Sequence, residues 1–335
     1  MGTKLTVKVM KELLNTAKDG EAEILSLIVE SIYTSKNCES ETDLSWLLIC
    51  DKKGRTLLHL ASMHGHVNVL NYIWKEILES TTSKKLRKQY IDMKDNKGRT
   101  SLFYASSRGY DDVVSYLINR DANLETSTNE NHIAPGSTAL MASAERNTVK
   151  CFELILDAKA NIHTQRRNRA DALYMAARYG NHEIIRHLAI NDYLNPIINR
   201  GTFHGRTAIL TASLNGHLGA CKELFKNGAN INYQDNDKLT PLILATNEGH
   251  VLVVRWLIQN GADIYRKDKH RGSALDAALA NGYGEIVNFL IKSQHIIENG
   301  GDIDDLTHIE KDIKQTKSPP ASPPPEFGAS TLAFL

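Results

Sequence analysis

Long hydrophobic runs are missing from this chain of 335 residues, although 41% of the residues are hydrophobic. No stretch is long and apolar enough to cross a bilayer, and the N-terminus lacks the apolar core of a secretory signal. We therefore predict no stable membrane insertion. A chain of this length and composition can instead bury an extended hydrophobic core.

Cysteine is scarce as well. The four cysteines are widely spaced and form no Cys-x-x-Cys pair; they are Cys38, Cys50, Cys151 and Cys221. This usage favours reduced thiols, and we expect a cytoplasmic or nuclear location.

An excess of one charge is also absent, because 40 lysines and arginines accompany 39 aspartates and glutamates, for a net charge of +1. Acidic residues concentrate near the N-terminus, between Glu12 and Asp43. Near neutrality and an acidic N-terminal end argue against a nucleic-acid partner.

The motifs of well-known catalytic chemistries do not occur. There is no Gly-x-Ser-x-Gly, no His-Glu-x-x-His and no Gly-x-x-x-x-Gly-Lys. Gly282-Tyr283-Gly284 lacks the third glycine of a nucleotide-binding loop. We predict no catalytic residue, no cofactor and no metal site.

The sequence does contain one pattern that repeats at an interval of 33 residues. Thr207-Ala208-Ile209-Leu210 is followed by Thr240-Pro241-Leu242-Ile243 and by Ser273-Ala274-Leu275-Asp276. Each copy continues with a pair of small residues, a glycine and an apolar helical segment. A fixed period of this length indicates a stack of like units.

Each part of the pattern has a mechanical role. The threonine hydroxyl caps a short first helix by accepting a free backbone N–H. Small residues let neighbouring helices approach, and Gly216, Gly249 or Gly282 ends the helix with a turn at positive φ. A second glycine closes the second helix at Gly228 and Gly261.

Thr-x-Leu-x-x-Ala, the Gly-His pairs at 216–217 and 249–250, and Gly-Ala-Asx-Ile resemble the ankyrin repeat. Seven copies begin at Thr56, Thr100, Thr138, Asp171, Thr207, Thr240 and Ser273. The resemblance implies an all-α ankyrin-repeat solenoid of stacked helix-turn-helix units with β-hairpin-like connecting loops. It also places His59 and His66 at structural positions that tie adjacent loops, so we do not interpret them and His64 as a metal cluster.

The expected organisation has four parts. Residues 1–50 form a degenerate N-terminal capping repeat, and residues 51–295 form the seven repeats. The first repeat has a lengthened second helix and a basic insertion at 79–92, because Thr56 and Thr100 are 44 residues apart. Residues 296–316 have the pattern of an amphipathic helix, and the proline-rich tail 317–335 is expected to be disordered.

Two copies lack the second glycine, since Asp121 and Lys159 stand where Gly228 and Gly261 stand. If these positions need left-handed geometry, a residue with a side chain is strained there by about 1 kcal/mol.

The resemblance implies that partners bind in a concave groove made by the first helices and by the loop tips. Cations outnumber acids at the tips, which favours an acidic protein partner; solubility alone is the alternative reason for charged turns. The candidate partner-binding residues are Met63, His64, Arg99, Arg108, Arg146, Arg166, Arg167, Arg169, Arg178, Tyr179, Phe203, His204, Arg206, Asn215, Lys269 and Arg271. Arg178 with Tyr179 is the first hot-spot candidate, and Phe203 with His204, in a tip that we expect to be expanded, is the second.

Three functions from different classes remain open at this point. The first is a non-catalytic adaptor or scaffold that holds one or more protein partners. The second is a substrate-recognition subunit of a ubiquitin ligase or another multiprotein enzyme, although no ligase-docking box is present. The third is an enzyme with a concealed site in the irregular copies around residues 125–137 or 190–206.

Short signals add three further predictions. Lys-x-x-Pro-x-x-Pro within residues 317–325 fits a polyproline-reading domain. The run from Lys84 to Arg87 fits a nuclear-import pattern, with a solvated charge run as the alternative. Gly2 fits the loose pattern for myristoylation.

Overall fold

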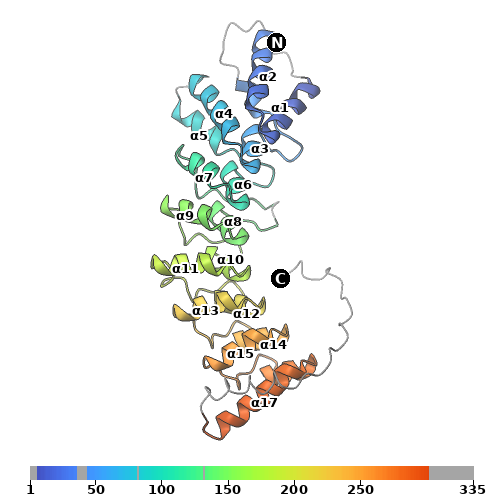
Figure 1. The fold of residues 1–335 in the computed structure, drawn as a ribbon, viewed down its shortest axis with the longest axis vertical. Coiled ribbons are helices and arrows are strands. Elements are labelled where there is room, and N and C mark those ends of the chain that lie inside the picture. Colours follow the sequence, from blue (N-terminus) through green and yellow to red (C-terminus); the bar gives the residue numbers. More distant parts are fainter. Residues whose placement is uncertain (1–5, 36–43, 81–82, 131–132, 302–335) are drawn as a thin grey trace, which may run out of the picture.

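The computed structural model describes residues 6–35, 44–80, 83–130 and 133–301. Over these ranges the chain forms seventeen α-helices and one 3-10 helix, with no β-strand. The predicted all-α solenoid is confirmed: helix pairs are stacked along one axis in two columns (Figure 1).

The inner column contains the first helix of each repeat. It consists of α3 (Leu57–His64), α6 (Ser101–Arg108), α8 (Ala139–Arg146), α10 (Ala172–Arg178), α12 (Ala208–Leu214), α14 (Pro241–Asn247) and α16 (Ala274–Ala280). Each helix packs on the next in this order, and α1 (Val7–Asp19) packs on α3 at the N-terminal end.

The outer column contains the second helices. It consists of α4 (Val67–Ser80), α7 (Asp111–Ile118), α9 (Val149–Asp157), α11 (His182–Ile190), α13 (Leu218–Lys226), α15 (Val251–Gln259) and α17 (Gly284–Glu298), with α2 (Ala22–Ser35) against α4. The 3-10 helix η1 (Leu44–Leu48) also packs on α4.

Five inner helices begin with the predicted side-chain cap, whereas the Thr207 hydroxyl at the start of α12 accepts no such bond. The hydroxyls of Thr100, Thr138 and Thr240 accept the backbone N–H three residues on, at 3.2–3.4 Å, and the Asp171 carboxylate does the same at 2.9 Å. At the other end, a left-handed residue terminates the helix in every repeat, as at Gly65 (φ 83°). Asn147 takes this role in the third repeat at φ 58°, which asparagine tolerates better than most residues.

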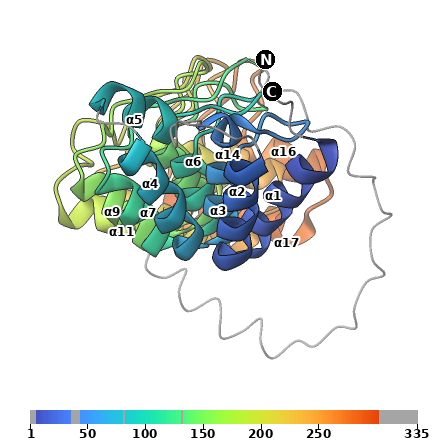
Figure 2. The same ribbon diagram turned by 90° about the horizontal axis from the view of Figure 1, so that it is seen from above.

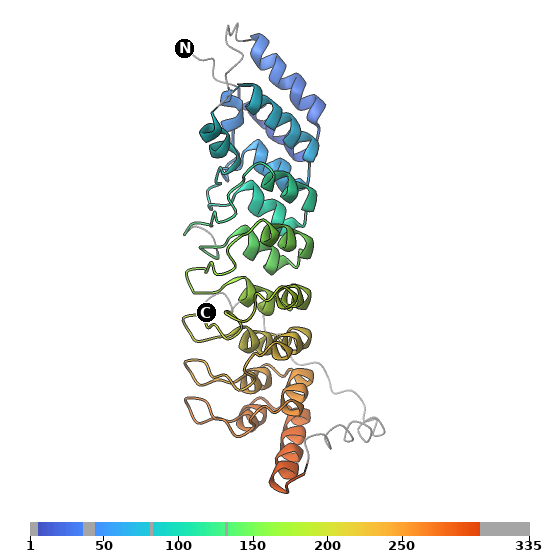
Figure 3. The ribbon, with the colours of Figure 1, turned by 90° about the vertical axis from the view of Figure 1, so that its left-hand side faces the viewer.

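A short hairpin precedes each inner helix, and the hairpins project from one side of the two columns (Figure 3). In six repeats the hairpin closes over five residues, 51–55, 95–99, 166–170, 202–206, 235–239 and 268–272, through a backbone bond of 2.8–3.1 Å. Neighbouring hairpins are also joined by one backbone hydrogen bond at each of the six junctions, at 2.9–3.5 Å. The tips are therefore ordered relative to one another before any partner binds.

The extra residues before Thr138 and before Thr207 have different positions in the structure. Before Thr138 the hairpin itself is longer and closes from Thr128 to Ser137. Before Thr207 the hairpin keeps its five residues, and the extra residues follow α11, where Ile197 and Ile198 donate to the Leu194 carbonyl. Our prediction of an expanded tip at Phe203 and His204 was wrong, because the spacing gives the number of extra residues and not their place.

The basic insertion in the first repeat is helical rather than a loop. It contains α5 (Lys84–Ile91), which lies on the hairpin side of the stack beside α4 (Figure 2). Asp92, at the end of α5, accepts the backbone N–H of Asn123 from the next repeat at 2.7 Å. The preceding helix α4 has 14 residues, against 8 or 9 in the outer helices α7, α9, α11, α13 and α15.

Two predicted segments lie wholly or mostly outside the described residues. They are the proline-rich tail 317–335 and the segment 296–316, of which only the first residues belong to the end of α17 and the turn after it.

Candidate functional site

The predicted groove residues on the inner helices lie at the last turn of each helix, just before the left-handed residue. Arg108, Arg146, Arg178, Tyr179 and Asn215 are exposed there. Met63 and His64 are half-buried at the same position of the first repeat. The solenoid therefore brings these residues, which are up to 152 positions apart in sequence, onto one face.

Arg178 and Tyr179 form a small cluster with the preceding repeat. Tyr179 is 44% exposed, and its hydroxyl donates to Glu145 at 3.4 Å. The Arg178 guanidinium lies 6.0 Å from the centroid of the Tyr179 ring. Burial and the neighbouring Glu145 charge raise the pKa of the Tyr179 phenol, so it stays a neutral donor at physiological pH.

Arg166 is not an exposed tip cation, and this part of our prediction was wrong. Its side chain is only 8% exposed and donates to Glu145 at 2.9 Å and to the Met175 sulfur at 3.1 Å. In four other hairpins an aspartate stands at this position, for example Asp95, whose carboxylate accepts two backbone N–H groups of its own hairpin. Arginine cannot accept these bonds, so it turns inward to the carboxylate of the inner helix.

Most other cations at the tips are paired as well. Arg99 binds Asp95 through two donors at 2.7 and 2.9 Å and stacks on the Tyr104 ring at 4.7 Å. Other pairs are Arg206 with Asp235 at 3.5 Å, Lys269 with Asp237 at 3.7 Å, and Arg167 with Glu130. The tips therefore do not present the row of free cations that the residue count suggested.

The exposed residues at the hairpin tips include cationic, aromatic and aliphatic side chains. The Arg169 guanidinium lies 4.8 Å from the centroid of Phe203, which is 55% exposed, and His204 and Arg271 are exposed. Sequence reasoning missed Ile133, which is 94% exposed in the long hairpin. An isoleucine inside a segment of turn-forming residues was the available signal.

The histidines of the first repeat have the structural roles that the resemblance implies. His59 is buried, and its Nε2 lies 3.0 Å from the Arg99 carbonyl; burial lowers the pKa of this imidazole. His66 Nε2 lies 2.8 Å from the Lys18 carbonyl. Across the described ranges, no three His, Cys, Asp or Glu side chains are grouped so as to hold a metal ion.

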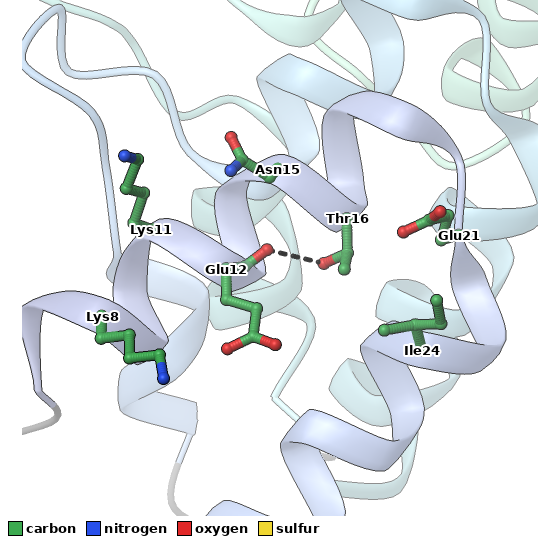
Figure 4. A pocket seen from close by; sticks show the side chains of 7 residues that line it. All are labelled: Lys8, Lys11, Glu12, Asn15, Thr16, Glu21 and Ile24. Atoms are coloured by element: carbon green, nitrogen blue, oxygen red, sulfur yellow. Dashed lines mark hydrogen bonds between the residues drawn. The ribbon is translucent and has the colours of Figure 1, made fainter.

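A pocket at the N-terminal end of the stack lies on α1 and the start of α2 (Figure 4). Its lining mixes Lys8 and Lys11 with Glu12 and Glu21, and the Thr16 hydroxyl is bonded to the Glu12 carbonyl of its own helix at 3.2 Å. Because the lining carries charges of both signs, it favours no single class of ligand, and we assign none. Among the helices that the structure describes, none has the length and apolar character needed to span a bilayer.

Comparison with known proteins agrees with this geometry. A family model for ankyrin repeats in three copies matches residues 76–166, 140–235 and 209–302, and a model for a single ankyrin repeat matches residues 53–76. The chain belongs to the ankyrin-repeat family. Ankyrin repeats are protein–protein interaction modules and are generally non-catalytic.

One relative is an ankyrin repeat and KH domain-containing protein from Caenorhabditis briggsae. It is 29% identical over 116 residues, which are 34% of this chain and 4% of that protein. The chain thus matches only a small part of the length of this relative.

Proposed function

We propose that this chain is a non-catalytic adaptor or scaffold that holds a protein partner against its inner helices and hairpin tips. The observation that carries the proposal is the cluster of Arg178, Tyr179 and Glu145 in the middle of an ordered face. Tyrosine and arginine dominate binding energies when they lie near the centre of an interface.

The ordered state of the tips supports the same proposal. Because hydrogen bonds already connect successive hairpins, a partner that binds across several repeats does not have to order them. Preorganisation of this kind reduces the entropic cost of association. The exposed Ile133 and Phe203 add apolar surface at the tips of the hairpins before α8 and α12.

A photo-crosslinking experiment tests the proposal. Benzoylphenylalanine replaces Tyr179 in one variant and Lys222, an exposed residue of the outer helix α13, in the control. Irradiation in cell extract should give discrete protein adducts from position 179 and few from position 222. Equal adduct patterns from both positions would refute binding through the inner face. Mass spectrometry of the adducts then shows whether ligase subunits are among them, which separates an adaptor from a ligase receptor.

A further inference from the structure

Cations occur in the last turn of several consecutive inner helices. Arg108 and Arg146 lie one residue before the left-handed residue that ends the helix, and Lys18 and Arg178 lie two residues before it. Arg108, Arg146 and Arg178 are the last residues of α6, α8 and α10, and His64 is the last residue of α3. In α1, Lys18 is followed by Asp19, the last residue of the helix. The row stops after α10, because α12 and α14 have Leu214 and Asn247 at their ends, followed by Asn215 and Glu248. This row is distinct from the hairpin tips, which lie at the opposite end of the inner helices.

The arginines of the row are not neutralised within the described part of the chain. Arg108 and Arg146 are exposed, and neither makes an ion pair or a side-chain hydrogen bond there. The Arg178 guanidinium lies over the ring of Tyr179. Glu145, which precedes Arg146 on α8, is already bonded to Arg166.

The cations of the row also act on His64, which lies among them. Burial lowers the pKa of His64, and the charges of His66, Lys18, Arg108 and Arg55 lower it further. A cationic surface attracts a partner of opposite sign and accelerates the encounter.

The spacing of the row restricts the shape of that partner. Packed helices lie about 8–10 Å apart. Here α6 packs on α8, and α8 packs on α10. A polyproline II segment rises about 9 Å in three residues, and every third side chain points to the same face. A β-strand of three residues spans a similar length, but its side chains alternate between faces.

We propose that Arg108, Arg146 and Arg178 bind an acidic protein segment in the polyproline II conformation, with one carboxylate at every third residue. The segment runs along the stack, across the inner helices, and each carboxylate meets one arginine. Prolines between the carboxylates lie against the half-exposed ring of Tyr179, since aromatic surfaces recognise this conformation. The inference rests on the proposed function and specifies the chemistry of the partner.

Two labelled peptides of the same composition test the spacing. The first is Glu-Pro-Ala-Glu-Pro-Ala-Glu, and the second is Glu-Glu-Pro-Ala-Pro-Ala-Glu. In fluorescence anisotropy with the full chain at 50 mM salt, the first should bind about fivefold more tightly. Equal affinities would overturn the inference.

Charge reversal tests the residues. The variant Arg108→Glu/Arg146→Glu/Arg178→Glu should weaken binding of the first peptide at least ~30-fold, because three attractions become repulsions. The control Lys150→Glu/Lys222→Glu/Lys226→Glu makes the same change in net charge on outer helices and should change affinity less than twofold. Far-UV circular dichroism verifies that both variants are folded. Equal losses in the two variants would assign the effect to bulk charge and refute the site.

A third arm separates the ligand classes. A single-stranded oligonucleotide that displaces the first peptide at a lower concentration than unlabelled peptide would overturn the inference and assign the row to nucleic acid. Crosslinking from position 179 in the arginine-reversed variant distinguishes the two proposals. Retained adducts together with equal peptide affinities would leave the protein-binding function in place and remove only the acidic segment.

Discussion

The position 21 residues after each inner-helix cap provides a quantitative test of the repeat architecture. Its backbone is left-handed in five repeats, including Lys159 at φ 71° and Gly228 at φ 91°. In both residues the backbone N–H donates to the carbonyl three residues earlier, at 2.9 and 3.0 Å. Lys159 therefore adopts the geometry that glycine adopts elsewhere, at the cost of a side chain in an unfavourable region.

Opposite substitutions at these two positions should have opposite effects on stability. Left-handed geometry costs a side-chain-bearing residue about 1 kcal/mol, and the greater freedom of unfolded glycine offsets about half of this. We expect Lys159→Gly to raise the free energy of unfolding by about 0.5 kcal/mol. Gly228→Ala should lower it by a similar amount through the backbone alone, because no atom lies within 4 Å of the added Cβ.

Urea unfolding followed by circular dichroism measures both changes. Because repeat stacks need not unfold in one step, hydrogen exchange of the amides in α9 and α13 should localise each effect to its own repeat. If the two substitutions shift the midpoint in the same direction, or Lys159→Gly lowers it, left-handed strain does not govern this position.

Two further predictions concern the hairpins. Glu145→Ala should lower stability by about 2 kcal/mol in urea unfolding, since buried Arg166 loses its carboxylate; equal losses in an Arg166→Met background would refute the coupling. Burial acts to raise the pKa of Asp95, but hydrogen bonds from Arg99 and Tyr104 outweigh it and hold the pKa below its usual value. The stabilisation is then present above the unfolded pKa of about 3.9 and is lost as the pH falls through the folded value. In the Asp95→Asn variant, the urea unfolding midpoint should fall less between pH 4 and pH 2 than in the original chain. An equal fall in both would contradict this.

The sequence was sufficient to predict the fold because each repeat depends on local chemistry. The caps at Thr100, Thr138 and Thr240 and the left-handed turn at Gly65 are decided by residues a few positions apart. The third non-glycine left-handed residue at a second-helix end, Asp192 at φ 56°, stands at the same offset and was overlooked.

The sequence predicted less well which cations of the candidate site are free and which are paired. Whether a tip cation is free depends on carboxylates brought by the preceding repeat, as Glu145 is brought to Arg166. One signal was present: Asp51 with Arg55 and Asp95 with Arg99 share the spacing of four residues that places both side chains on one hairpin. A count of charges at the tips does not use this spacing.

The hairpin ladder also has a mechanical consequence. Along the tips, successive repeats are joined by backbone hydrogen bonds, whereas the outer helices are joined across repeats by exposed ion pairs such as Arg186 with Glu223 at 3.1 Å. Ionic strength screens the second kind of link far more than the first. We therefore expect added salt to loosen the contacts between outer helices more than those between hairpins, and so to change the curvature of the solenoid.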